Sequence, residues 1–182
     1  MEQFPHTCGM MQGDMQVALC EPLAQLKREH TPLRQQMNDF AALAGNIGYD
    51  PQFSDWSERL SALKAKVDAF IQVLDPHSEI EEEGLFPLMA KYIGREVGPI
   101  AVMEYEHEQA KKHLSTFVEM LEAESAPIPA ERAREIAAHA LQAHSILTDH
   151  FTKEEVVLFP MAERILSDAD KAELKQQMKI SN

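Results

Sequence analysis

Hydrophobic positions recur along most of the chain at alternating steps of three and four residues, which is the spacing of one face of an α-helix. The first such series runs from Leu19 to Ala44, and similar series run from Trp56 to Glu81, from Ile100 to Leu121 and from Ile136 to Val157. Steps that average 3.5 residues keep each series facing its neighbours, so the pattern predicts four long helices packed at shallow angles around one core.

Segments that contain glycine or proline divide the four series, at residues 45–51, 94–99 and 125–129. Such residues favour turns. The expected elements are long helices at 18–44, 54–83, 97–124 and 130–157, short helical pieces at 85–92 and 160–166, and a final helix near 168–178. Residues 1–17 have no clear period and are expected to form a loosely held arm, followed by one domain over 18–182. The predicted fold class is therefore all-α: an antiparallel four-helix bundle with a short additional C-terminal helix.

Composition and charge exclude several classes of partner. The 182 residues include 30 acidic and 17 basic side chains, for a net charge of -13, and such a surface repels nucleic acids and anionic membranes. The chain has neither a long apolar run nor a basic, apolar start, so we expect no transmembrane helix and no secretory signal. Two cysteines, Cys8 and Cys20, are too few to stabilise a chain of this length by disulfides. This favours a location in the reducing cytoplasm. Electron relay, a reversible disulfide or iron transfer are conceivable roles for them, but their spacing matches no metal motif and an incidental role is simpler.

The chain contains an internal repeat. Residues 77–87 (HSEIEEEGLFP) align without a gap to residues 150–160 (HFTKEEVVLFP), and the Glu-His pair at 29–30 aligns with the pair at 106–107. The repeat predicts two helical hairpins of similar design. The Leu-Phe-Pro element that closes each segment is expected to end a helix and to cover a site with an aromatic ring.

Each hydrophobic series carries one histidine, and two of these histidines are followed four residues later by a glutamate on the same helix face. The resulting set is His30, His77, Glu81, His107, His150 and Glu154. A single core histidine is more often hydrogen-bonded than metal-bound, but one on each of four series favours a metal site. Two buried carboxylates also need a matching positive charge, which a pair of cations supplies. Mixed nitrogen and carboxylate ligands suit iron, manganese or zinc, and the ligand types alone do not choose among them.

Other glutamates lie next to these candidates. Glu82 and Glu155 directly follow Glu81 and Glu154. On a regular helix each is rotated by about 100° from the glutamate before it, so Glu82 and Glu155 need not enter the core. Glu29 and Glu106 each precede a candidate histidine. They could line an access path or receive protons, but a solvated helix flank is the simpler interpretation.

A ferritin-type site is a further alternative, because Glu104 stands three residues before His107. Di-iron carboxylate sites of that type need the Glu-x-x-His motif twice. Lys27 and Leu147 occupy the corresponding positions in two other series. We therefore set this alternative aside.

Taken together, the motifs resemble those of the hemerythrin-like proteins, also called the His-His-Glu cation-binding domain. The resemblance covers about residues 19–166 and rests on the Glu-His pairs at 29–30 and 106–107 and on segments 77–87 and 150–160. It implies a four-helix bundle around a non-haem centre of two Fe ions with an oxo or hydroxo bridge, in which manganese or zinc is also possible. By this resemblance, the terminal ligands would be His30, His77, His107 and His150, and the bridging carboxylates Glu81 and Glu154.

The chain departs from the oxygen-carrying members of that family at two positions. Those members have a fifth histidine one turn after the third-helix ligand, where this chain has Lys111, and an aspartate five residues after the last histidine, where this chain has Glu154 at four. The set of four histidines and two glutamates is more similar to the bacterial iron-sulfur cluster repair branch, which acts in nitric-oxide and oxidative stress. We find no match to the separate cysteine-bearing N-terminal domain of some repair proteins. Loss of one imidazole leaves an additional open coordination position, which favours reactivity.

The leading hypothesis is a metal site that binds or reacts with O2, peroxide or NO, in stress defence or in repair of iron-sulfur centres. Its partners would then be the small molecule and either an iron-sulfur protein client or an electron donor. The alternatives are a non-enzymatic protein that binds, stores or senses O2 or NO, and a metal-stabilised structural bundle that acts through partners. The sequence leaves open whether the protein is an enzyme.

Overall fold

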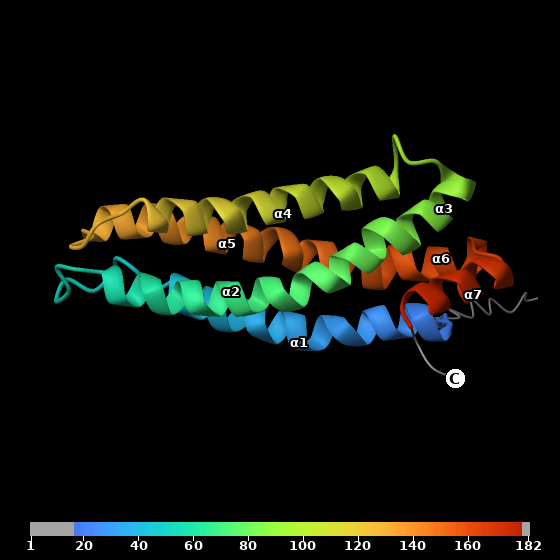
Figure 1. Ribbon diagram of the computed structural model, residues 1–182, viewed down its shortest axis with the longest axis horizontal. Coiled ribbons are helices and arrows are strands. Elements are labelled where there is room, and N and C mark those ends of the chain that lie inside the picture. The colour runs from blue at the N-terminus through green and yellow to red at the C-terminus, as the bar shows by residue number, and fades with distance from the viewer. Residues whose placement is uncertain (1–16, 180–182) are drawn as a thin grey trace, which may run out of the picture.

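The computed structural model describes residues 17–179 and confirms the all-α prediction. Four long antiparallel helices form the bundle: α1 (Glu21–Ala44), α2 (Ser57–Ile80), α4 (Pro99–Glu122) and α5 (Ala130–Lys153). Figure 1 shows two hairpins lying side by side, with their connecting loops at one end and the short helices at the other. The predicted N-terminal arm lies almost entirely outside the described residues.

Five shorter elements complete the described chain. They are η1 (Glu81–Leu85), α3 (Phe86–Ile93), η2 (Glu154–Leu158), α6 (Phe159–Ile165) and α7 (Asp168–Gln177). Both η segments are π-helical turns, in which the N–H of Phe86 reaches the carbonyl of Glu81 and the N–H of Phe159 reaches that of Glu154. The expectation that Leu-Phe-Pro ends each helix is therefore wrong. A proline cannot donate a backbone hydrogen bond and clashes with the carbonyl four residues earlier, and a widened turn lets the helix continue past it.

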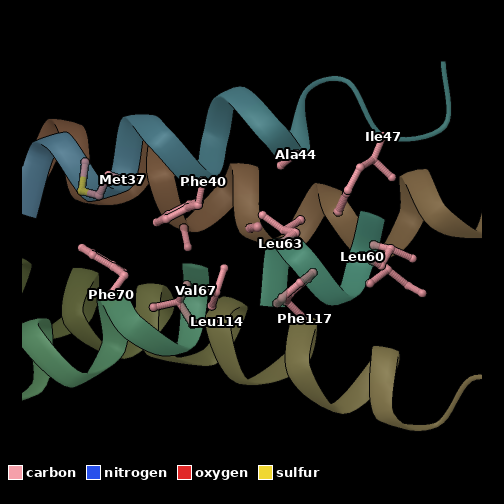
Figure 2. Close-up of a cluster of buried hydrophobic side chains, with 14 of the residues drawn as sticks. Met37, Phe40, Ala44, Ile47, Leu60, Leu63, Val67, Phe70, Leu114 and Phe117 are labelled. Carbon is pink, nitrogen blue, oxygen red and sulfur yellow. The ribbon is translucent and has the colours of Figure 1, made fainter. Parts of the chain in front are cut away.

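The predicted hydrophobic series face one another in the core. Figure 2 shows part of this core, where aromatic and aliphatic side chains from α1, α2 and α4 pack together. Leu19 and Leu121, at the ends of two series, are only half-buried. Val157 was expected to face inward but is 48% exposed, and Leu158 is buried in its place. The π turn explains this shift, because its wider turn delays the inward position by one residue.

The loops at one end of the bundle tie the two hairpins together. The N–H of Trp56 donates to the carbonyl of Ile128 (3.0 Å), and the N–H of Ile128 donates to Asp55 (3.0 Å). Arg134 donates to the carbonyl of Gly48 (2.6 Å), whose φ of 82° favours glycine. These contacts hold the long 45–56 connection across the end of the bundle.

A second apolar cluster fills the other end, where α3, α6 and α7 pack on the beginnings of α1 and α4. Helix α7 starts with a capping box formed by Ser167 and Asp170. Asp170 also accepts hydrogen bonds from Lys91 (2.9 Å) and Tyr92 (2.5 Å) of α3. No helix within residues 17–179 is long and apolar enough to cross a membrane.

Candidate metal centre

The six side chains singled out by the sequence meet between the two apolar clusters, and none is more than 4% exposed. They form two groups of four whose donor atoms all lie within 4.8 Å of one another. The first group is His30, His77, Glu81 and Glu154, and the second is Glu81, His107, His150 and Glu154. Both glutamates belong to both groups, so the arrangement has two adjacent ligand sets that share two carboxylates.

Each shared glutamate directs one oxygen toward each ligand set. Glu81 places Oε1 3.4 Å from Nε2 of His77 and Oε2 3.5 Å from Nε2 of His107. Glu154 repeats the arrangement between the other two histidines, at 3.3 Å in each case. Two donors at right angles on one cation, each about 2.1 Å from it, lie roughly 3 Å apart. The observed spacings of 3.3–3.5 Å are therefore compatible with ligands of a common ion.

The hydrogen bonding of these atoms supports the same conclusion. Among the described residues, the four oxygens of Glu81 and Glu154 are buried without a hydrogen-bond partner, as are Nε2 of His30 and Nε2 of His77. The other two imidazoles, those of His107 and His150, point Nε2 atoms at each other over 2.8 Å. The six buried atoms without a partner are costly in this state, and cations would satisfy them.

A ring of four further glutamates holds the outer nitrogen of each imidazole. Every candidate histidine shares a hydrogen bond between its Nδ1 and the carboxylate of a glutamate from the neighbouring helix. The pairs are Glu29 with His77 (2.9 Å), Glu82 with His107 (2.6 Å), Glu106 with His150 (3.2 Å) and Glu155 with His30 (2.9 Å). An Nδ1–H that donates to a carboxylate fixes the tautomer and leaves the Nε2 lone pair free for a metal.

These four carboxylates correct the sequence interpretation, which left them as solvated flanks or outside the core. Each pair joins a glutamate of one helix to a histidine of the next: α1 to α2, the turn after α2 to α4, α4 to α5, and the turn after α5 back to α1. Each carboxylate has a second, outer partner. These partners are Gln25 on Glu29, Lys111 on Glu82, Lys153 on Glu106 and Arg34 on Glu155. The repeated Glu-His and Glu-Glu pairs in both halves of the sequence are the signal from which the ring could have been found.

The shared glutamates differ in their electrostatics. Burial, with the facing carboxylate of Glu154, raises the pKa of Glu81 well above its usual range. Burial also acts to raise the pKa of Glu154, but the imidazoles of His150 and His30 outweigh it and hold that pKa below its usual value. Burial acts to lower the pKa of His150, yet the carboxylates of Glu154 and Glu106 raise it to about 9. Without a cation, protons on Glu81 and His150 therefore offset part of the negative charge.

Phenylalanine rings cover the centre. Phe86 lies 5.6 Å from the ring of His107, and Phe159 lies 5.6 Å from that of His30. The aromatic cover expected of the two Leu-Phe-Pro elements is thus present. Phe151, which the sequence did not single out, stacks on His30 at 4.3 Å. Phe151 directly follows His150 and therefore lies off the predicted hydrophobic series, which is why sequence analysis did not single it out.

The remaining candidates lie outside the two ligand sets. Glu104 accepts a hydrogen bond from Arg95 (2.7 Å), as expected once the ferritin-type alternative is set aside. Lys111 donates to the ring carboxylate Glu82 instead of taking the place of a fifth histidine. Cys20 is half-buried and belongs to neither set, and Cys8 lies outside the described residues.

Comparisons with known proteins agree with this geometry. A sequence model of the hemerythrin HHE cation-binding domain matches residues 21–162, which include the four long helices and both π turns. The iron-sulfur cluster repair protein YtfE of Musicola paradisiaca is 28% identical over 141 residues, or 76% of this chain and 63% of that protein. YtfE of Yersinia pseudotuberculosis is 26% identical with the same coverage. The zinc finger protein BRUTUS of Arabidopsis thaliana is 26% identical over 161 residues, 86% of this chain but 12% of BRUTUS. The chain thus spans less than two thirds of the length of these relatives.

Proposed function

We propose that the chain, which belongs to the hemerythrin HHE cation-binding domain family, holds two iron ions, one in each ligand set. The observation that carries this proposal is the sharing of both glutamates. Glu81 and Glu154 each direct their two oxygens toward histidines of different sets, which is what a bridging carboxylate does. The four imidazoles would then be terminal ligands. Nitrogen and carboxylate ligands also suit manganese and zinc, so metal content is part of the test.

We further propose that the centre binds or reacts with O2, peroxide or NO, in stress defence or in repair of iron-sulfur centres. When bound, the two irons would supply the redox chemistry toward these small molecules. Two relatives that are named iron-sulfur cluster repair proteins support the repair role. The position of Lys111, whose ammonium group lies on Glu82, supports a centre with one imidazole fewer than an oxygen carrier.

The protein's own residues prepare the site for this chemistry. The ring carboxylates hold the four Nδ1 atoms and keep the Nε2 lone pairs directed at the centre. The pKa of Glu82 is held at about 2 by its hydrogen bonds with His107 and Lys111, so this carboxylate remains ionised at neutral pH. Phe86, Phe151 and Phe159 pack on the imidazoles and exclude water from those sides of the centre.

The test is the metal content of anaerobically purified protein, together with its visible spectrum before and after O2 and NO. We expect about two irons per chain and absorption bands that change with the gas. Protein without iron, or with one spectroscopically silent zinc, would refute the redox proposal. Turnover with an electron donor would then indicate an enzyme, whereas a stable, reversible adduct without turnover would indicate a binding or sensing protein.

A further inference from the structure

The outer partners of the carboxylate ring do not all carry the same charge. Three ring glutamates accept a hydrogen bond from a cation: Glu82 from Lys111 (2.7 Å), Glu155 from Arg34 (3.1 Å) and Glu106 from Lys153. The fourth, Glu29, accepts one from the neutral amide of Gln25 (2.8 Å). Arg28 contacts the oxygen of that amide, but its own charge is paired with Glu21 (2.7 Å).

The internal repeat shows where this difference arises. Arg34 and Lys111 are equivalent, because each stands four residues after a candidate histidine that follows a repeated glutamate. Each of them binds the ring glutamate at the start of an η segment. The equivalence ends at Lys153, because the repeat has Ile80 at the corresponding position. Ile80 packs against the apolar cluster beside the short helices and brings no charge to Glu29.

The two ligand sets therefore lie in different electrostatic fields. In the set of His107 and His150, both ring carboxylates are paired with a lysine, so these four charges cancel. In the set of His30 and His77, the described ion pairs give a cation to only one of the two ring carboxylates, so one unit of negative charge remains. The two shared glutamates belong to both sets and do not distinguish them.

We infer, on the basis of the proposed two-ion centre, that the two sets bind metal with unequal affinity and that the first ion enters the set of His30 and His77. Lys153 creates the difference, acting on the other set through its ion pair with Glu106. One unit of charge acting on a divalent ion through a few residues, in a partly solvated environment, changes the affinity roughly tenfold. The first ion also neutralises both shared carboxylates, so the second ion is attracted less strongly still.

The test is anaerobic iron(II) titration of the full chain against a competing chelator, in two variants that each damage one set. His107→Gln leaves the set of His30 and His77 complete, and His77→Gln leaves the other set complete. We expect the tightest ion to bind roughly tenfold more tightly in His107→Gln than in His77→Gln. This ratio should shrink as salt is added, because Lys153 is 45% exposed and its charge is therefore screened.

A second substitution tests the role of the lysine. Lys153→Gln, added to His77→Gln, removes the cation but keeps an amide that can donate to Glu106. It should tighten iron binding roughly tenfold and so match His107→Gln. Lys112→Gln in the same background is the matched control, because it changes the net charge equally at an exposed position outside the ring. Circular dichroism and thermal unfolding of the metal-free variants show whether each is folded.

Lys153→Gln in the parent chain gives a measurement that needs no damaged set. The second ion should bind about fivefold more tightly, whereas the first should change by no more than about twofold, because the two sets then become alike. Equal or reversed affinities in the two histidine variants would overturn the inference, as would a Lys153→Gln variant that behaves like Lys112→Gln. In those cases a parent with two irons leaves the proposed function intact. A parent that binds no iron would instead refute the proposed function, and this inference with it.

Discussion

The carboxylate ring predicts that a residue without any metal bond controls metal affinity. The cleanest perturbation is Glu29→Gln, because the outer partner of Glu29 is the neutral Gln25 and the substitution leaves no cation unpaired. The glutamine oxygen can still accept the hydrogen bond of His77, which Glu29 accepts at 2.9 Å, so shape is kept and only the negative charge is lost. Loss of such an outer partner weakens metal binding by about 10- to 100-fold.

This factor converts to about 1.4–2.7 kcal/mol of binding free energy. With metal in excess, the same amount is lost from the free energy of unfolding of the loaded protein, since ligand-linked stability follows the dissociation constant. For a domain of this size, the melting temperature of the loaded protein should fall by about 3–11 °C. The metal-free protein should change by no more than about 0.5 kcal/mol, because Glu29 is half-buried and keeps a similar partner.

The assay is anaerobic iron(II) titration against a competing chelator, combined with calorimetric unfolding of the loaded and metal-free protein. Glu108→Gln is the matched control, because Glu108 also neighbours a candidate ligand, His107, but is exposed. Parent-like iron affinity in Glu29→Gln would refute the reasoning. So would an equal loss of stability with and without metal, which would make Glu29 a structural residue only.

Three further predictions follow from the site and the fold. Glu81→Ala should lower metal occupancy and destabilise only the loaded protein, as measured by metal analysis and paired unfolding curves. Metal uptake at pH 7 should release protons, because a pKa of about 9 keeps His150 protonated without metal and the raised pKa of Glu81 favours its protonated form; calorimetry in two buffers of different ionisation enthalpy measures this release. Hydrogen bonds from Ser167, Tyr92 and Lys91 hold the pKa of Asp170 below its usual 3.8. This contribution is present above the usual pKa and lost as pH falls through the folded one, so Asp170→Asn should be less stable than the parent at pH 7 and should converge with it in acid.

Much of the fold could be predicted from the sequence because helical periodicity is a strong signal in long amphipathic helices. The predicted helices at 18–44 and 130–157 correspond to α1 and to α5 with η2. The same periodicity failed at Val157, because it assumes 3.6 residues per turn and the π turn is wider. No local propensity marked that turn apart from Pro160, which could equally have ended the helix.

The ring of glutamates escaped prediction for a different reason. A helical wheel places Glu82 and Glu155 relative to their own helices, whereas their partners are His107 and His30 on neighbouring helices. Such contacts depend on the order of helices around the bundle, which a single sequence does not state. The helices follow one another around the bundle in the order α1, α2, α4, α5. In this order, a glutamate on or just after each helix orients the histidine of the next helix. No half of the chain can then orient its histidines alone, because Glu82 serves the second hairpin and Glu155 serves the first. The ring thus couples assembly of the whole bundle to preparation of the site.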